Sequence, residues 1–217
     1  MAKEMTKGLF IAFEGPEGCG KSTHSKRLAK ELSSAGHEVV HTAEPGGTAL
    51  GKKIREILLE KEDIHFNSRA ELFLFEADRA EHVREVIIPA LESRKIVICD
   101  RFNTATFAYQ GYGLGVDLGL VKAVDDIATS GIAPDMVVLL DIDVASGLKR
   151  AASGRAADKM EKRSLDFHNR VRDGYLAIAE NDPERIHVID SAGEIEEVYR
   201  CIKERTHGLI ERYTRAR

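Results

Sequence analysis

Cysteine is scarce in this sequence, because the 217 residues include only Cys19, Cys99 and Cys201, which lie far apart. Three widely spaced cysteines provide neither a disulfide framework nor the paired spacing of a zinc site. We therefore expect reduced thiols and a cytoplasmic protein.

Long apolar runs and an excess of positive charge are also missing. No stretch approaches the ~20 apolar residues of a membrane span, and Met1–Gly8 lacks the apolar centre of a signal peptide. The chain carries 32 lysines and arginines against 36 aspartates and glutamates, a net charge of −4. This balance gives no support to general nucleic-acid binding. We expect neither a membrane nor a nucleic acid as a partner.

The composition that is present is ordinary for a globular protein, with 43% hydrophobic and 31% charged residues. A chain of this length suits one α/β domain with a full core and is too short for two large ones. No repeat or low-complexity linker divides it. We expect a single domain over residues 1–217.

The stretch Gly15–Ser22 matches the pattern G-x-x-x-x-G-K-[ST] of a phosphate-binding loop. The glycines let backbone N–H groups point at phosphate oxygens, Lys21 supplies a mobile cation, and Ser22 offers a hydroxyl to Mg²⁺. An apolar run precedes the loop and a helical pattern follows it, as the motif requires. The sequence therefore predicts a nucleoside triphosphate site formed by Gly15, Pro16, Glu17, Gly18, Cys19, Gly20, Lys21, Ser22 and Thr23.

Short apolar segments alternate with helical patterns along the whole chain. The strand-like segments are residues 8–13, 37–42, 95–100, 136–143 and 185–190. The helical patterns cover about 22–35, 48–59, 68–93, 105–109, 117–129, 144–152, 165–179 and 194–213. Buried parallel strands appear as continuous apolar runs, and their alternation with helices places helices on both faces of the sheet. We predict an α/β, three-layer P-loop NTPase fold with a five-stranded parallel sheet.

The segment Ala151–Ser164 differs from its surroundings because small residues and a run of charges replace the apolar pattern. Such a segment buries little, so we expect it to form a mobile lid over a site.

The pair Asp100-Arg101 ends the third apolar strand. In an open parallel sheet, ligands bind at the carboxyl ends of the strands, which places this pair near the phosphate loop. Asp100 is suited to hold Mg²⁺ or its water, and Arg101 to bind a second phosphate through its planar fork of donors. A surface Asp-Arg turn is the alternative interpretation.

Two further stretches carry weaker signals. Gly46-Gly47 in the stretch Glu44–Thr48 allows a close backbone approach to a ligand, and Thr48 is suited to cap the next helix. Phe75, Arg79 and His82 share one helical face. On periodicity alone, a core Phe75 and a solvated Arg79 are favoured over a site that stacks and hydrogen-bonds a base.

Together, four stretches resemble thymidylate kinases, the dTMP kinases among the P-loop nucleoside monophosphate kinases. They are Phe13–Thr23, Glu44–Thr48, Leu74–Arg79, and Asp100–Phe102 leading to Ala108–Gly111. The phosphate loop is shared with many families, whereas the order and spacing of all four stretches are specific to this one.

The resemblance implies a role for each matching residue of the acceptor site. Phe75 would stack on thymine and Arg79 would hydrogen-bond the edge of the base, while Thr106 and Gln110 line the base pocket. Tyr109 would crowd the sugar 2′ position and so favour deoxyribose. Glu17 would contact the sugar 3′-hydroxyl.

The resemblance also implies how charge is handled. Arg101 would hold the acceptor phosphate and Asp100 would organise Mg²⁺. Family members with an arginine in the phosphate loop have it where this chain has Gly18, so this chain resembles the subtype whose arginines come from the lid. Among Arg150, Arg155 and Arg163, we favour Arg155 as the catalytic arginine.

One departure from the family pattern concerns Ala43, which stands where an arginine usually precedes Glu-Pro-Gly-Gly-Thr. This puts one cationic contact near the acceptor phosphate in doubt, and Arg55 is the candidate replacement.

The resemblance implies ATP-dependent phosphorylation of dTMP to dTDP with Mg²⁺, for dTTP synthesis, by a homodimer. A kinase for another nucleotide and a non-catalytic nucleotide-binding module stay open as alternatives. A GTPase is disfavoured because the sequence has no guanine-reading Asn-Lys-x-Asp stretch.

Overall fold

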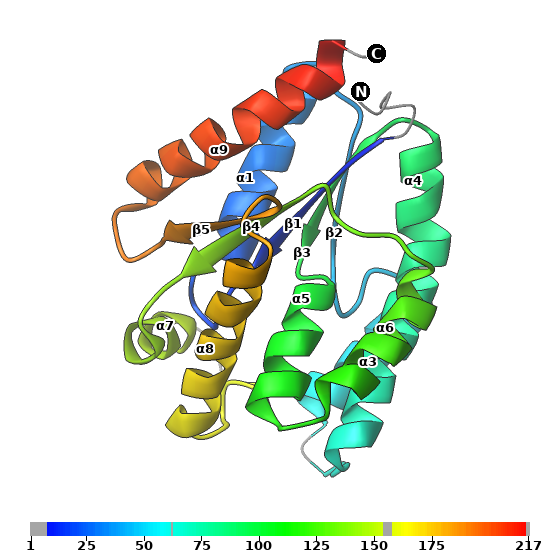
Figure 1. Cartoon of the computed structure of the whole chain (residues 1–217), viewed down its shortest axis with the longest axis vertical. Coiled ribbons are helices and arrows are strands. Elements are labelled where there is room, and N and C mark those ends of the chain that lie inside the picture. The colour runs from blue at the N-terminus through cyan, green and yellow to red at the C-terminus, as the bar shows by residue number, and fades with distance from the viewer. Residues whose placement is uncertain (1–7, 62, 154–157, 216–217) are drawn as a thin grey trace.

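The protein contains one five-stranded sheet, in which every pairing between strands is parallel. The structure, a computed structural model, describes residues 8–61, 63–153 and 158–215. The strands lie in the order β2-β3-β1-β4-β5 (Figure 1). Their bounds are β1 (Leu9–Glu14), β2 (Val39–Ala43), β3 (Ile96–Asp100), β4 (Met136–Asp141) and β5 (Ile186–Asp190). The predicted strands and the predicted fold class are confirmed.

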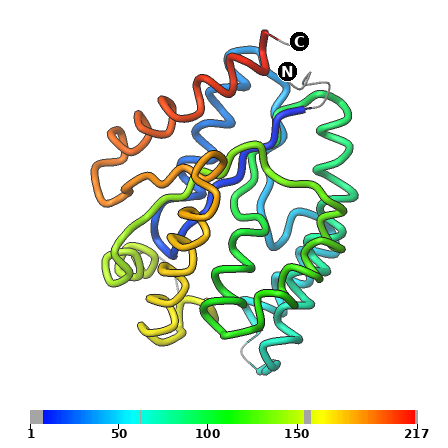
Figure 2. The backbone as a smooth tube through the Cα atoms, in the orientation of Figure 1, coloured from blue at the N-terminus to red at the C-terminus, as the bar shows by residue number. Residues whose placement is uncertain are grey.

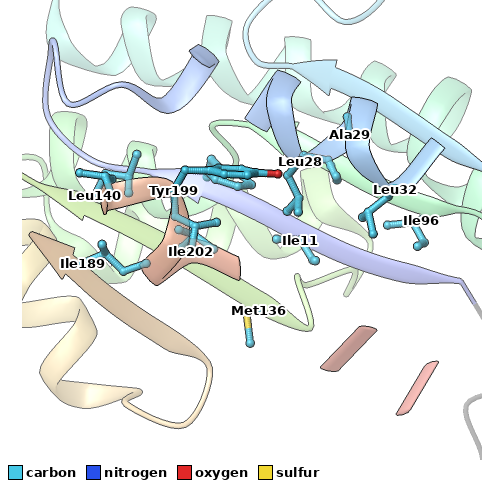
Figure 3. Close-up of a cluster of buried hydrophobic side chains, with 14 of the residues drawn as sticks. Ile11, Leu28, Ala29, Leu32, Ile96, Met136, Leu140, Ile189, Tyr199 and Ile202 are labelled. Carbon is cyan, nitrogen blue, oxygen red and sulfur yellow. The ribbon is translucent and has the colours of Figure 1, made fainter. Parts of the chain in front are cut away.

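The central strands are apolar along their whole length because both of their faces are covered. In β1, Leu9, Ile11 and Phe13 point into one core, and Phe10 and Ala12 point into the other, as the period of two in a strand requires. The first core lies against α1 (Lys21–Ser34) and α9 (Ile195–Arg215), and Figure 3 shows Leu28, Tyr199 and Ile202 packed there. The second core lies beneath α8 (Leu165–Asn181) and the helices before β3. Helices on both faces of the sheet make the three layers.

The remaining helical segments connect the strands and build the walls of the site. They are α2 (Ala49–Arg55), η1 (Glu56–Glu60), α3 (Ser68–His82), η2 (Val83–Ile87), α4 (Ile88–Glu92), α5 (Asn103–Thr106), η3 (Phe107–Gly113), α6 (Leu118–Thr129) and α7 (Val144–Ala151). Thr48 accepts a hydrogen bond from the backbone N–H of Gly51, so its predicted role as the cap of the second helix is confirmed.

The long helical stretch predicted over residues 68–93 is present, with one change of winding. The π-helical turn η2 separates α3 from α4, and Pro89 stands in the first turn of α4. Proline has no backbone N–H to donate to the preceding turn, so a change of winding beside Pro89 agrees with its chemistry.

The register between β1 and β3 determines where the site lies. Phe13 pairs with Asp100, so the loop that follows β1 and the turn that follows β3 leave the sheet side by side. Figure 2 shows β1 running away from the end of the molecule where α9 finishes. The phosphate loop and the pair Asp100-Arg101 therefore share the carboxyl edge of the sheet.

Within the residues that the structure describes, none of the helices combines the length and the apolar character needed to span a bilayer.

Replacing Ile98 by alanine tests the two-sided packing of the sheet. Ile98 is fully buried in β3, so we expect the free energy of unfolding to fall by about 2–5 kcal/mol. Val188 in β5 is 44% exposed, and Val188→Ala should change stability by less than about 0.5 kcal/mol. Urea denaturation measures both, and equal losses in the two variants would contradict the packing described here.

Candidate functional site

A cavity of about 390 Å³ opens at the carboxyl edge of the sheet. Residues distant in the sequence line it, including most of those singled out from the sequence. The lining includes Glu17, Gly18, Gly20, Lys21, Ser22, Thr23, Arg55, Phe75, Arg79, Asp100, Arg101, Thr106, Tyr109 and Gln110. Gly15, Pro16 and Cys19 shape the loop without lining the cavity, and Arg155 lies outside the described residues. The fold thus gathers the candidate residues, while their individual roles stay predictions.

The phosphate loop holds its own lysine in place. Lys21 is 6% exposed, and its Nζ donates hydrogen bonds to the carbonyl oxygens of Gly15 (3.0 Å) and Pro16 (2.8 Å). Gly20, with a φ of +94°, lets the backbone enter α1 in the left-handed region. The loop therefore presents a positioned ammonium group to the cavity.

The tip of the loop packs directly on α7, the helix that leads into the predicted lid. A Cβ atom on Gly18 would lie 1.9 Å from the carbonyl oxygen of Gly147, and one on Gly147 would lie 2.3 Å from that of Glu17. Gly18 also has a φ of +69°. Neither position accepts a side chain without movement of the backbone, which explains why this loop carries glycine, and not arginine, after Glu17.

Ser22 and Asp100, the two predicted magnesium ligands, meet across the cavity floor. The Ser22 hydroxyl donates a hydrogen bond to Asp100 Oδ2. Among the described residues, no group of three or more histidine, cysteine, aspartate or glutamate side chains could hold a metal by itself. Mg²⁺ in phosphate-transfer sites takes only one or two protein oxygens and completes its shell with phosphates and waters. A hydroxyl and a carboxylate side by side fit that requirement.

Arg101 is fixed by its backbone and by its side chain. Its φ of +70° is unusual for a residue with a side chain, and its guanidinium donates to Glu17 Oε1 at 2.8 Å. Further bonds run to the Gly15 carbonyl oxygen (3.2 Å) and to the Tyr175 hydroxyl (3.3 Å). The arginine is thereby held against the phosphate loop.

Glu17 links Arg101 to Tyr109, because its carboxylate accepts hydrogen bonds from both side chains. Burial opposes its ionisation, but the Arg101 guanidinium and the Lys21 ammonium outweigh burial and lower the pKa of Glu17 to about 2. Tyr109 donates its hydroxyl to the same carboxylate oxygen at 2.7 Å. Glu17 is therefore ionised at neutral pH and orients both neighbours.

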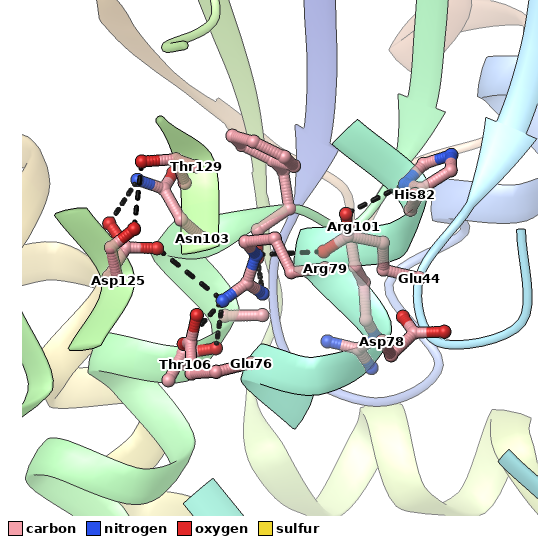
Figure 4. A network of polar contacts seen from close by, with 12 residues as sticks. Glu44, Glu76, Asp78, Arg79, His82, Arg101, Asn103, Thr106, Asp125 and Thr129 are labelled. Carbon is pink, nitrogen blue, oxygen red and sulfur yellow. Dashed lines mark hydrogen bonds and ion pairs between the residues drawn. The ribbon is translucent and has the colours of Figure 1, made fainter. Parts of the chain in front are cut away.

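Arg79 is buried in a polar network, shown in Figure 4. Its side chain is 2% exposed and contacts the carboxylates of Glu44 (2.9 Å), Glu76 (2.6 Å) and Asp125 (3.5 Å). It also donates to the Thr106 hydroxyl at 2.9 Å and to the Phe102 carbonyl at 3.2 Å. The interpretation of Arg79 as a solvated residue is wrong, because its pairing with carboxylates offsets the cost of burying its charge.

Three carboxyl groups surround the single guanidinium of Arg79. Burial raises the pKa of Glu76 to about 7 against the opposing effect of Arg79, with Asp125 and Glu44 raising it further. His82, fully buried, bridges Glu44 Oε1 (2.7 Å) and the Thr42 hydroxyl (2.6 Å). The network fixes the guanidinium at the edge of the cavity.

The other predicted base-pocket residues come from two helices. Phe75 on α3 is half-buried, and Gln110 on η3 is buried and donates its side-chain amide to Glu71 Oε1 at 3.0 Å. Arg163 pairs with the other oxygen of Glu71. One carboxylate therefore links the pocket wall to the end of the predicted lid.

The described parts of the predicted lid make specific contacts. Arg150, just before the predicted lid, donates to the carbonyl oxygens of Ser191 and Ala192, both at 2.8 Å. The Cζ atom of Arg163 lies 4.7 Å from the ring centroid of Phe167. The ammonium of Lys159 donates to the Lys61 and Ile64 carbonyls. Arg150 and Arg163, two of the three candidate arginines, thus make contacts within the protein.

Arg55 contacts the stretch that follows Ala43, the position where the family usually has an arginine. Its guanidinium donates to the Pro45 carbonyl at 3.0 Å, and both Arg55 and Ala43 line the cavity. This placement is compatible with the replacement predicted from the sequence.

Several residues of the site were not assigned a role from the sequence, namely Glu14, Glu44, Glu76, Asp125 and Tyr175. A single carboxylate at the end of the apolar run 9–14, and the spacing of three between Glu76 and Arg79, were available signals. Nothing in the local pattern around Asp125 or Tyr175 points to the site.

The contact between Gly18 and Gly147 yields a test. Gly147→Ala should move the loop and weaken binding of ATP–Mg²⁺ roughly tenfold, or about 1.4 kcal/mol, in calorimetric titration. Gly208→Ala is the matched control, since its nearest atom would be a side-chain nitrogen of Arg212 at 3.6 Å, and it should leave binding unchanged. Unaltered affinity in Gly147→Ala would show that the loop tolerates displacement.

Comparison with known proteins identifies the family. The family model described as thymidylate kinase matches residues 13–202. A thymidylate kinase of Desulfovibrio desulfuricans is 46% identical over 96% of this chain and 98% of its own. One of Deinococcus radiodurans is 44% identical over 94% of this chain and 100% of its own.

A solved structure agrees with these sequences. The crystal structure of thymidylate kinase from Ehrlichia chaffeensis superposes with a TM-score of 0.76 at 36% identity, covering 91% of this chain and 97% of that one. Because the family model matches most of the chain and these relatives align along nearly its whole length, the chain belongs to the thymidylate kinase family.

Proposed function

We propose that this protein transfers the γ-phosphoryl group of ATP to dTMP, giving ADP and dTDP for dTTP synthesis. The observation that carries the proposal is one cavity that joins the phosphate loop to a pocket lined by Phe75 and Arg79. Arg101 lines the same cavity and donates a hydrogen bond to the Gly15 carbonyl of the phosphate loop. Membership of the thymidylate kinase family supports the choice of acceptor.

At the acceptor end, Phe75 stacks on thymine and Arg79 donates to the base, with Thr106 and Gln110 beside them. Tyr109 crowds the sugar 2′ position and Glu17 contacts the 3′-hydroxyl. Their common placement on the cavity wall supports these assignments. Because Arg79 is already anchored by carboxylates, it needs little reorganisation when the base binds.

The acceptor phosphate is held by Arg101, and Arg55 replaces the contact that Ala43 lacks. Ser22 and Asp100 would hold Mg²⁺, which supplies positive charge to the phosphates of ATP. The hydrogen bond between these two side chains supports their joint role.

Catalysis in this proposal is positioning and charge stabilisation. Lys21 and Arg101 face the phosphates, and the acceptor is a phosphate dianion, so the reaction requires no general base. A lid over residues 151–164 excludes water, which would otherwise accept the phosphoryl group. Arg155 contributes a cation to the transition state.

We propose further that the chain forms one kinase domain and acts as a homodimer in the cytoplasm. Phe73 on α3 is 52% exposed and Ile127 on α6 is 78% exposed. Large exposed apolar side chains on two packed helices support an interface at this face. The free thiols of Cys19, Cys99 and Cys201 suit a reducing compartment.

The function is tested by ADP release with ATP–Mg²⁺ and each nucleoside monophosphate in turn. We expect strong stimulation by dTMP, weaker stimulation by dUMP and negligible stimulation by ribonucleotides. Equal stimulation by another monophosphate would overturn the assignment of the base pocket. No stimulation by any of them would favour a nucleotide-binding module.

The lid arginine is tested by Arg155→Ala, with Lys149→Ala on α7 as a control for loss of an exposed positive charge. We expect Arg155→Ala to lower kcat by ~10² or more with little change in dTMP affinity, as for a contact made in the transition state. Near-normal turnover of this variant in steady-state kinetics would remove Arg155 from the mechanism.

A further inference from the structure

Glu14 places an acidic side chain inside an otherwise apolar strand. It is the last residue of β1, 0% exposed, and directly precedes the phosphate loop. Burying a carboxylate costs free energy unless partners compensate. Its partners therefore indicate why it is there.

One carboxylate oxygen caps the helix that follows Arg101. Glu14 Oε1 accepts from the backbone N–H of Phe102 at 2.8 Å and from that of Ala105 at 3.2 Å. The residue before α5 provides no side-chain cap of its own. Since α5 continues directly into η3, Glu14 anchors the helical segment 103–113 that carries the predicted base-pocket residues.

The other oxygen reaches Arg101 through a tyrosine. The Tyr175 hydroxyl donates to Glu14 Oε2 at 2.9 Å and accepts from the Arg101 guanidinium at 3.3 Å. The backbone N–H of Arg101 donates to the Phe13 carbonyl, and the next N–H, that of Phe102, donates to Glu14. These two bonds flank the left-handed turn at Arg101. Glu14 thus holds both the turn and the side chain of Arg101.

We propose that Glu14 is a positioning residue that holds Arg101 in place for the acceptor phosphate. The inference rests on the proposed function, because it assigns Arg101 to the phosphate of dTMP. Glu14 itself does not line the cavity.

Burying the Glu14 carboxylate costs folding free energy, and this cost supports a functional reason for its presence. Burial raises the pKa of Glu14 to about 7, although the Phe102 N–H, Arg101, Tyr175 and Lys21 all oppose the rise. In the unfolded chain this carboxyl loses its proton near pH 4.5, so folding stability falls as the pH rises toward 7.

The test is Glu14→Gln, measured at pH 8.5. The amide oxygen can still accept the two backbone N–H groups, but the amide nitrogen cannot accept from Tyr175. We expect kcat/KM for dTMP to fall about tenfold or more, as for the loss of a charge-assisted hydrogen bond. The KM for ATP should change less than about twofold, and the urea midpoint should not fall, because no buried carboxylate remains.

Tyr175→Phe removes the bridging hydroxyl and should lower kcat/KM for dTMP in the same direction. Tyr213→Phe is its matched control. This buried tyrosine donates to the Arg94 carbonyl, away from the cavity, and kcat/KM for dTMP should be unchanged.

A double-mutant cycle decides whether Glu14 acts through Arg101. Adding Glu14→Gln to Arg101→Ala should cause little further loss, because coupled residues are not additive. An equal loss in both backgrounds, or a parallel loss of stability and ATP binding, would overturn the inference. So would normal dTMP kinetics in Glu14→Gln. Failure of the wild-type protein to respond to dTMP would instead refute the proposed function.

Discussion

The parallel pairing of β1 with β3 is the constraint on which the site depends. Its register pairs Phe13 with Asp100. The phosphate loop after β1 and the Asp100-Arg101 turn after β3 therefore begin at neighbouring points of the sheet edge. The bonds from Ser22 to Asp100, from Arg101 to Glu17 and from the Phe102 N–H to Glu14 all cross this junction. A shift of one residue would turn alternate side chains to the opposite face and separate these partners.

Around that junction, largely buried cations are held by groups that also fix their direction. Arg79 is surrounded by carboxylates and Arg101 by Glu17 and Tyr175, while Lys21 is held by loop carbonyls. Charges fixed before the substrate arrives need little reorganisation during phosphoryl transfer, which is the main source of electrostatic stabilisation in such sites. Burying these cations costs free energy, which their partners offset, and the fixed positive charges then serve the proposed activity.

Direct contacts join the segments at the two ends of the predicted lid to the phosphate loop and to the predicted base pocket. Gly18 packs closely on Gly147, so the phosphate loop and the helix leading to the predicted lid are in direct contact. Arg163 and Gln110 both contact Glu71, which joins the end of the predicted lid to the wall of the predicted base pocket.

The sequence alone determined the strands, the phosphate loop and the Asp100-Arg101 pair, because apolar runs and glycine spacing depend on local backbone chemistry and two-sided burial. It could not decide whether Arg79 is solvated, since the helical period is the same either way. Only the tertiary structure brings Glu44, Asp125 and Thr106 to that guanidinium. The same holds for Glu14, whose partners Phe102 and Tyr175 lie 88 and 161 residues away in sequence. Contacts of that separation follow from how strands and helices pack, and no local pattern encodes them.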